Sequence, residues 1–240
     1  MSESNLIFEP EGRFLSLRGP YINQLGLQSD LHVQPEYIEN RLIRDGEENG
    51  HHITVINHLE ITSLIPLYDK NKEENDITIS KGQHKKLFKK TQKDIHDTIV
   101  NQFGSALDWQ RPIDLGIGHC ADEEANTYYR VIHWPFGQMI REKIGLPKTN
   151  FHITVGFSPR DVHIYKGPAT LICLRKGEHC SQKQLQKLID VVEYYFEDKV
   201  FIKALYQTCW RHKYIKEFCS LTRIYIFCKF IVLCFRKLFV

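Results

Sequence analysis

Apolar side chains alternate with polar ones in several short segments of this chain, as they do in half-buried strands. A short apolar alternation marks residues 12–19, and β-branched enrichment marks HHITVI after the turn-forming Asn49-Gly50. Further strands are predicted at 114–120, 127–134, 150–157, 161–167 and 169–177. These strands are separated by long segments, and helices in those segments could cover one face of each sheet.

Apolar residues at helical spacing predict four helices. Proline near the first turn and glycine at the end delimit two of them, over 35–46 and 135–145. A third is expected from about Lys85 to Phe103 with Gly104 ending it, after a charged loop that begins at residue 68. The fourth spans 181–198, where Ser181 and Gln184 can form a capping box.

The tetrapeptide HITV occurs twice, at 52–55 and at 152–155. Each copy follows a predicted helix, a glycine that ends it (Gly46, Gly145) and a polar turn. The recurrence of the flanking pattern indicates a duplicated supersecondary unit with a pseudo-two-fold relation, with lobes of about 12–105 and 106–198.

The composition is that of an ordinary globular protein, with 240 residues, 42% hydrophobic and 25% charged. The formal net charge of +3 divides unevenly, because residues 201–240 hold eight Lys/Arg against one Glu, whereas residues 1–200 hold 24 against 28. The mildly acidic body excludes a globally basic nucleic-acid surface, so a phosphate ligand would need a local site.

Seven cysteines without a C-x-x-C pair fit neither a disulfide framework nor a zinc finger, and reduced thiols are expected. The N-terminus shows no secretory signal, so the expected location is cytoplasmic. The tail at 201–240 is basic, aromatic and rich in cysteine, with an apolar run at 224–235 that is shorter than a membrane span. A membrane anchor, an end that never packs and an ordinary buried helix all remain open for it, and membrane contact is not favoured.

In a strand, His52 and Thr54 lie on one face about 6.6 Å apart, and His51 faces the other way. Two such strands brought together offer two imidazoles and two hydroxyl groups. One histidine can take a proton from water while the other gives one to a departing oxygen, and the hydroxyls can bind phosphate oxygens. This chemistry needs no metal or cofactor. Taken singly, each HITV is more often plain strand sequence with a structural histidine.

The paired motifs, each a histidine and a threonine between aliphatic or aromatic residues, resemble those of the two-histidine phosphoesterase superfamily (LigT-like). The segments DLHVQPEYIENRL and HITVGFSPRDVHIYKG look most like its Swiss Army Knife RNA-repair-like branch. The resemblance covers about 12–198 and implies a bilobal α+β fold, with antiparallel sheets lining a central cleft and helices outside. It also implies hydrolysis of cyclic phosphodiesters of RNA ends or small nucleotides, with His52 and His152 as acid and base and Thr54 and Thr154 as phosphate donors.

Weaker candidates for substrate binding are His163 and Lys166, which follow the second motif and could add positive charge, and Tyr21, Trp134 and Phe136, which could stack on a base. The expected partner is an RNA end or nucleotide and not DNA, and the expected state is a monomer. Two alternatives remain open: a non-catalytic RNA or nucleotide binder that uses the same cleft, and a membrane-associated interaction protein that acts through its tail.

Overall fold

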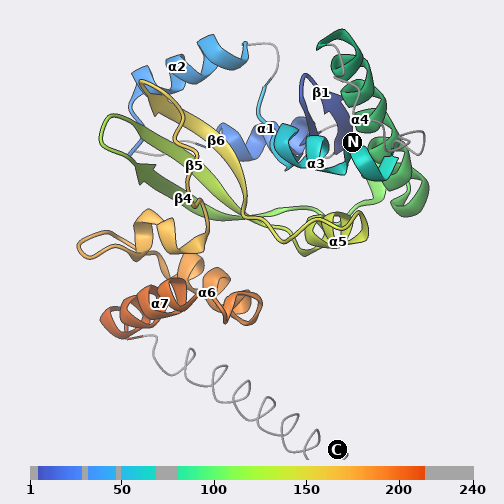
Figure 1. The fold of residues 1–240 in the computed structure, drawn as a ribbon. Helices are drawn as coiled ribbons and strands as arrows, with labels where there is room; N and C mark the ends of the chain where they lie inside the picture. Colours follow the sequence, from blue (N-terminus) through green and yellow to red (C-terminus); the bar gives the residue numbers. More distant parts are fainter. Residues whose placement is uncertain (1–4, 29–31, 47–49, 69–80, 214–240) are drawn as a thin grey trace, which may run out of the picture.

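The computed structural model describes residues 5–28, 32–46, 50–68 and 81–213, and it is an α+β fold with two three-stranded antiparallel sheets (Figure 1). The first sheet has the order β1-β2-β3 and the second β4-β5-β6. The strands are β1 (Ile7–Glu11), β2 (Phe14–Arg18), β3 (Ile53–Ile56), β4 (Ile113–Ala121), β5 (Asn126–His133) and β6 (Phe151–Ser158). The predicted fold class is confirmed, with one sheet in each lobe.

The first sheet packs on α4 (Lys81–Phe103), and α3 (His58–Tyr68) packs on α4 and adds Ile61 and Leu64 to the same core. Leu15 and Leu17 of β2 and Ile53 and Val55 of β3 are fully buried, as their alternation predicts. A shorter helix, α1 (Pro20–Gly26), follows β2, and a 3-10 turn, η2 (Ala106–Asp108), follows α4. The opposite face of this sheet is left for polar side chains.

The second sheet is a hairpin of β4 and β5 with β6 added along β5. Asp122 shapes the hairpin turn, because its Oδ1 accepts from the backbone N–H groups of Glu124 and Ala125. One face of the sheet is covered by elements from the last third of the described chain. They are η3 (Pro168–Thr170), η4 (Ile172–Leu174), α6 (Gln182–Asp190), η5 (Val192–Tyr195) and α7 (Lys199–Arg211).

The repeated helices are present, and each lies on the sheet of the other lobe. The helix α2 (Pro35–Asp45), which leads into β3, packs on β6, and Asn40 donates to the Phe157 carbonyl at 3.0 Å. The helix α5 (Pro135–Lys143), which leads into β6, packs on β3. Figure 1 shows α2 over the sheet of β4 to β6 and α5 beside α3. This exchange brings β3 and β6 into contact at the middle of the molecule.

Two predicted strands were wrong. Residues 161–167 form an irregular connection, and residues 169–177 form the two short 3-10 turns η3 and η4, with one isolated bridge from Leu171 to Gly118. Leu171 and Leu174 are buried, so the apolar run reflects packing against β4 and not strand alternation. The helix predicted at 181–198 is also interrupted, because α6 ends at Asp190 and η5 follows. The Ser181 cap is confirmed, with its hydroxyl accepting from the Gln184 N–H at 3.2 Å, but the Gln184 side chain donates to the Leu115 carbonyl at 3.0 Å, so the predicted capping box is only half formed.

The first part of the predicted tail is a helix in the second core. Phe201, Leu205 and Cys209 of α7 are fully buried, so residues up to 211 belong to the lobe. Within the part of the chain that the structure describes, no helix has the length and apolar character to cross a membrane. The apolar run at 224–235 lies outside the described residues.

Candidate functional site

The two HITV segments have the same exposure pattern and lie at β3 and β6, strands of different sheets that contact each other; His52 stands just before β3. Ile53 and Ile153 are fully buried, and Val55 and Val155 are buried as well. The histidine and the threonine of each copy point the other way and are half-buried. The positive charge that His52 would carry lowers the pKa of His152, so the two imidazoles are close enough for their charges to interact.

His152 is held by the residue that precedes its strand and by a ring on the neighbouring strand β5. Its Nδ1 lies 3.2 Å from the Asn150 carbonyl oxygen, and its ring meets the Tyr129 ring edge-on at 5.7 Å. Burial, together with the nearby Lys166 ammonium, lowers the pKa of His152 to about 4, against the opposing Asn150 hydrogen bond. His152 is therefore neutral at physiological pH. Because a carbonyl can only accept, Nδ1 carries the proton and Nε2 has the free lone pair.

His52 has a different partner at the same ring atom. The Nη2 of Arg18 lies 3.4 Å from His52 Nδ1, and Phe14 stacks on the imidazole with ring centroids 5.1 Å apart. Arg18 is itself held by Glu11, which accepts from its Nε at 2.6 Å. Burial lowers the pKa of His52; Glu11 opposes this shift, and Arg18 adds to it. A guanidinium can only donate, so in neutral His52 the Nδ1 accepts and Nε2 carries the proton.

An ionic network lies beside the second motif, with Asp161 and Lys166 buried and Arg44 partly exposed. Asp161 binds the Lys166 Nζ at 2.7 Å and the Arg44 Nη1 at 2.9 Å, and its Oδ2 lies 3.5 Å from the Thr154 hydroxyl. Burial alone would raise the pKa of Asp161, but the two cations outweigh burial and hold it at about 2. Lys166 is 3% exposed and lies over the Tyr129 ring at 5.4 Å. The network therefore keeps one positive charge beside His152.

A family model described as "Swiss Army Knife, 2H phosphoesterase domain" matches residues 13–163, which include both HITV segments. The chain belongs to this family of 2H phosphoesterases. No curated protein and no solved structure matches the sequence. Membership supports a phosphoesterase activity, and the finer substrate class is left to the chemistry of the site.

The weaker sequence candidates of this 2H phosphoesterase are placed differently from one another. Lys166 lies beside His152, as described above. His163 is exposed and lines an open pocket together with Arg44 and Asp161. The Tyr21 hydroxyl donates to the Pro112 carbonyl at 2.8 Å, and the Arg111 guanidinium lies over the Tyr21 ring. The hydroxyl of Tyr21 therefore already has a partner away from the two motifs.

His51 has the structural position that the strand period predicted. It is 5% exposed, and its backbone N–H donates to Asn23 Oδ1 at 2.6 Å. Its ring lies against Gly26 so closely that a Cβ there would come within 2.2 Å of the imidazole. Burial lowers the pKa of His51 to about 4, so the imidazole is neutral where it packs against Gly26.

Sequence reasoning missed the charged residues that surround the two motifs. Arg18 and Glu11 lie on β2 and β1, whereas Arg44 and Asp161 come from the end of α2 and the connection after β6. A basic residue after a strand alternation gives no signal of its own, since its role depends on the strand paired with it. Within the residues that the structure describes, no group of three or more metal-ligating side chains is placed to hold an ion.

Proposed function

We propose that this 2H phosphoesterase hydrolyses a cyclic phosphodiester, of the 2′,3′ or a related kind, at RNA ends or on a small nucleotide, without a metal. The observation that supports it is the complementary state of the two imidazoles. His152 offers a lone pair at Nε2 and His52 offers an N–H at Nε2, and they lie at strands that contact each other. A phosphorus between them has a base on one side and a proton donor on the other.

The roles follow from these ring atoms. His152 Nε2 takes a proton from water as the water oxygen bonds to phosphorus. The ester bond to one ribose oxygen breaks, and that oxygen takes the proton from His52 Nε2, so the product is a phosphomonoester with a free hydroxyl. The proton donor in this step is the imidazolium form of His52, which an anionic phosphate nearby favours and which returns to neutral imidazole when the proton leaves. Each proton transfer is worth about 10²- to 10⁴-fold in rate.

The non-bridging oxygens would be held by groups already aimed at this face. The Thr54 hydroxyl makes no hydrogen bond to any of the described residues, and the Thr154 hydroxyl has only a long contact to Asp161. Both are available as donors. Lys166 adds positive charge from behind His152, and its ammonium is held there by the ion pair with Asp161.

The test is turnover of a panel of 2′,3′-cyclic nucleotides by the pure protein, in the presence of a chelator. Either His52→Ala or His152→Ala is expected to lower kcat by 10² or more, because each removes one proton transfer. His84→Ala is the matched control, since His84 is an exposed histidine on α4. Binding without turnover would favour the non-catalytic nucleotide binder, and unchanged activity in both variants would refute the proposal.

A further inference from the structure

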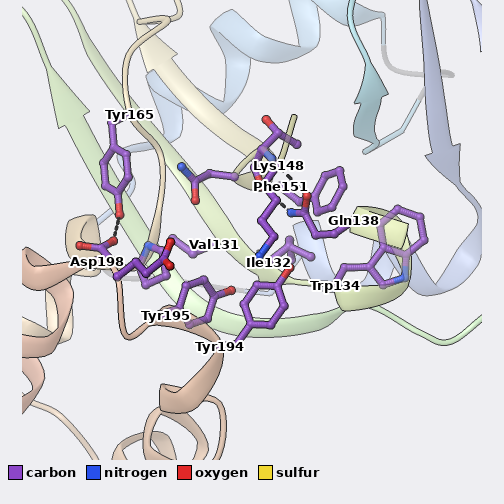
Figure 2. Close-up of a pocket in the computed structure, with 14 residues that line it drawn as sticks. Val131, Ile132, Trp134, Gln138, Lys148, Phe151, Tyr165, Tyr194, Tyr195 and Asp198 are labelled. Carbon is purple, nitrogen blue, oxygen red and sulfur yellow. Dashed lines mark hydrogen bonds between the residues drawn. The ribbon is translucent and has the colours of Figure 1, made fainter. Parts of the chain in front are cut away.

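A pocket of about 360 Å³ lies beside the second motif, between the end of the β5–β6 ladder and the segment that leads into α7 (Figure 2). Five of its 14 lining residues are aromatic, and Figure 2 labels all five. They are Trp134, Phe151, Tyr165, Tyr194 and Tyr195. Pockets with aromatic walls and a few polar groups are suited to flat organic rings.

The pocket begins one residue away from His152. Asn150 lines it, and the Asn150 carbonyl is the group that holds His152 Nδ1. Val131 also lines it and pairs directly with His152 across β5 and β6, so the two side chains lie on the same face of the sheet. A ligand with its phosphate at His152 could therefore extend into this space.

The charges around the pocket argue against phosphate as its occupant. Glu197 and Asp198 lie on its rim, and Lys148 is the only cation among the lining residues. Asp198 accepts from the Tyr165 hydroxyl and from the Phe201 N–H at 2.9 Å, so it is fixed there. Two carboxylates against one ammonium repel an anion but can accept from the N–H groups of a neutral ring.

Lys148 also identifies a surface on which a ring can lie. Its Nζ is 5.4 Å from the centroid of Tyr194, which is 37% exposed. Lys148 is exposed, so an entering ring can take its place over Tyr194 at little cost. The Tyr194 ring is supported from behind by edge contacts with His133 and Tyr195, at 5.0 and 5.1 Å.

We propose that this pocket binds the nucleobase of the substrate whose phosphate is attacked between His52 and His152. The proposal rests on the proposed function and adds the part of the substrate that the motifs do not contact. Tyr165, Tyr194, Tyr195 and Asp198 all lie beyond residue 163, where the family match ends. Base recognition is thus assigned to the C-terminal elements of this chain.

The experiment compares two substrates that share the reacting group. Adenosine 2′,3′-cyclic phosphate carries a base, and the methyl riboside 2,3-cyclic phosphate does not. In Tyr194→Ala, KM for the adenosine compound is expected to rise about 5- to 150-fold, the effect of losing one stacked base. KM for the methyl riboside and kcat for both substrates should stay unchanged.

Two variants serve as controls. Tyr194→Phe keeps the ring and should restore KM for the adenosine compound. Tyr206→Ala removes a comparably exposed tyrosine from α7, outside the pocket, and should leave both substrates unaffected. An equal effect of Tyr194→Ala on both substrates, or no effect on either, overturns the base pocket and leaves the proposed hydrolysis standing.

Binding separates this proposal from the catalytic one. Trp134 lines the pocket, so adenosine, which has no phosphate, should change the intrinsic tryptophan fluorescence in a saturable way. Tyr194→Ala should abolish that change and Tyr206→Ala should keep it. If no cyclic substrate is turned over but adenosine binds in this manner, the hydrolysis fails and the pocket stands. If adenosine produces no change, the pocket is refuted.

Discussion

At the residue scale, the catalytic potential lies in how each imidazole is held. The sequence predicted that two histidines and two threonines would share a face, because strand alternation depends only on neighbours in the chain. It could not predict that Arg18 would meet one Nδ1 and the Asn150 carbonyl the other. Arg18 is 34 residues from His52, and its role arises only when β2 pairs with β3.

The depressed histidine pKa values predict an acid-shifted pH profile. The base must be unprotonated, so kcat/KM falls as pH drops through the pKa of His152, near 4. The acid must be protonated, so kcat/KM also falls as pH rises through the pKa of His52, which lies below the usual 6.5. A bell-shaped profile of kcat/KM with its optimum below pH 6.5 is expected. An optimum above pH 7.5 would contradict the assignment.

Lys166 is expected to set the acid limb of that profile. Its positive charge beside His152 disfavours the imidazolium, so Lys166→Met should raise the pKa of His152 and move the acid limb upward by roughly one pH unit. Lys176→Met removes an exposed lysine and should leave the limb in place. A fall in activity without movement of the limb would mean that Lys166 acts only through stability.

At the element scale, the exchange of helices between lobes is the feature that the sequence could not reveal. Proline and glycine correctly delimited α2 and α5, yet nothing in their patterns says on which sheet each one packs. The two misassigned strands at 161–167 and 169–177 have a related cause. A short apolar run marks burial, and burial against β4 can be achieved by 3-10 turns as well as by a strand.

Arg141 is expected to be the main polar contact that holds α5 on the first lobe. From α5 it donates to the Val55 carbonyl of β3 at 2.7 Å and pairs with Glu60 at 2.6 Å, and it is 2% exposed. Arg141→Met leaves Glu60 and the carbonyl without this donor, and should cost about 3 kcal/mol or more in unfolding free energy. The loss of unfolding free energy is measured by urea unfolding of the variant and of the unchanged protein.

Arg160→Met is the control for that experiment. Arg160 is 55% exposed and pairs with Asp122 at 2.7 Å, so its loss should cost less than about 1 kcal/mol. Equal destabilisation by the two substitutions would show that Arg141 does not join the lobes as described.

At the scale of the whole molecule, the family match and the folded unit do not coincide. The match over 13–163 contains both motifs, but the second core is completed by later elements, including α7. The same later segment supplies Lys166 beside His152 and the tyrosines of the pocket. The basic charge of residues 201–240 led to their prediction as a separate tail. Phe201 and Leu205 are fully buried, however, so the start of that region belongs to the second lobe.

Two truncations locate the end of the folded unit. A chain ending at residue 198 loses Phe201, Leu205 and Cys209, which are fully buried, together with the Thr208 and Arg211 hydrogen bonds to the Leu174 carbonyl. Phe and Leu burial is worth about 1.5–3 kcal/mol per side chain, so the loss approaches the stability of a whole domain. This chain should melt at a clearly lower temperature or fail to fold. A chain ending at residue 213 keeps all these contacts and should melt at a clearly higher temperature than the chain that ends at residue 198. If the two truncated chains melt alike, α7 contributes nothing to the core, and the C-terminal elements cannot be the fixed wall that the base pocket requires.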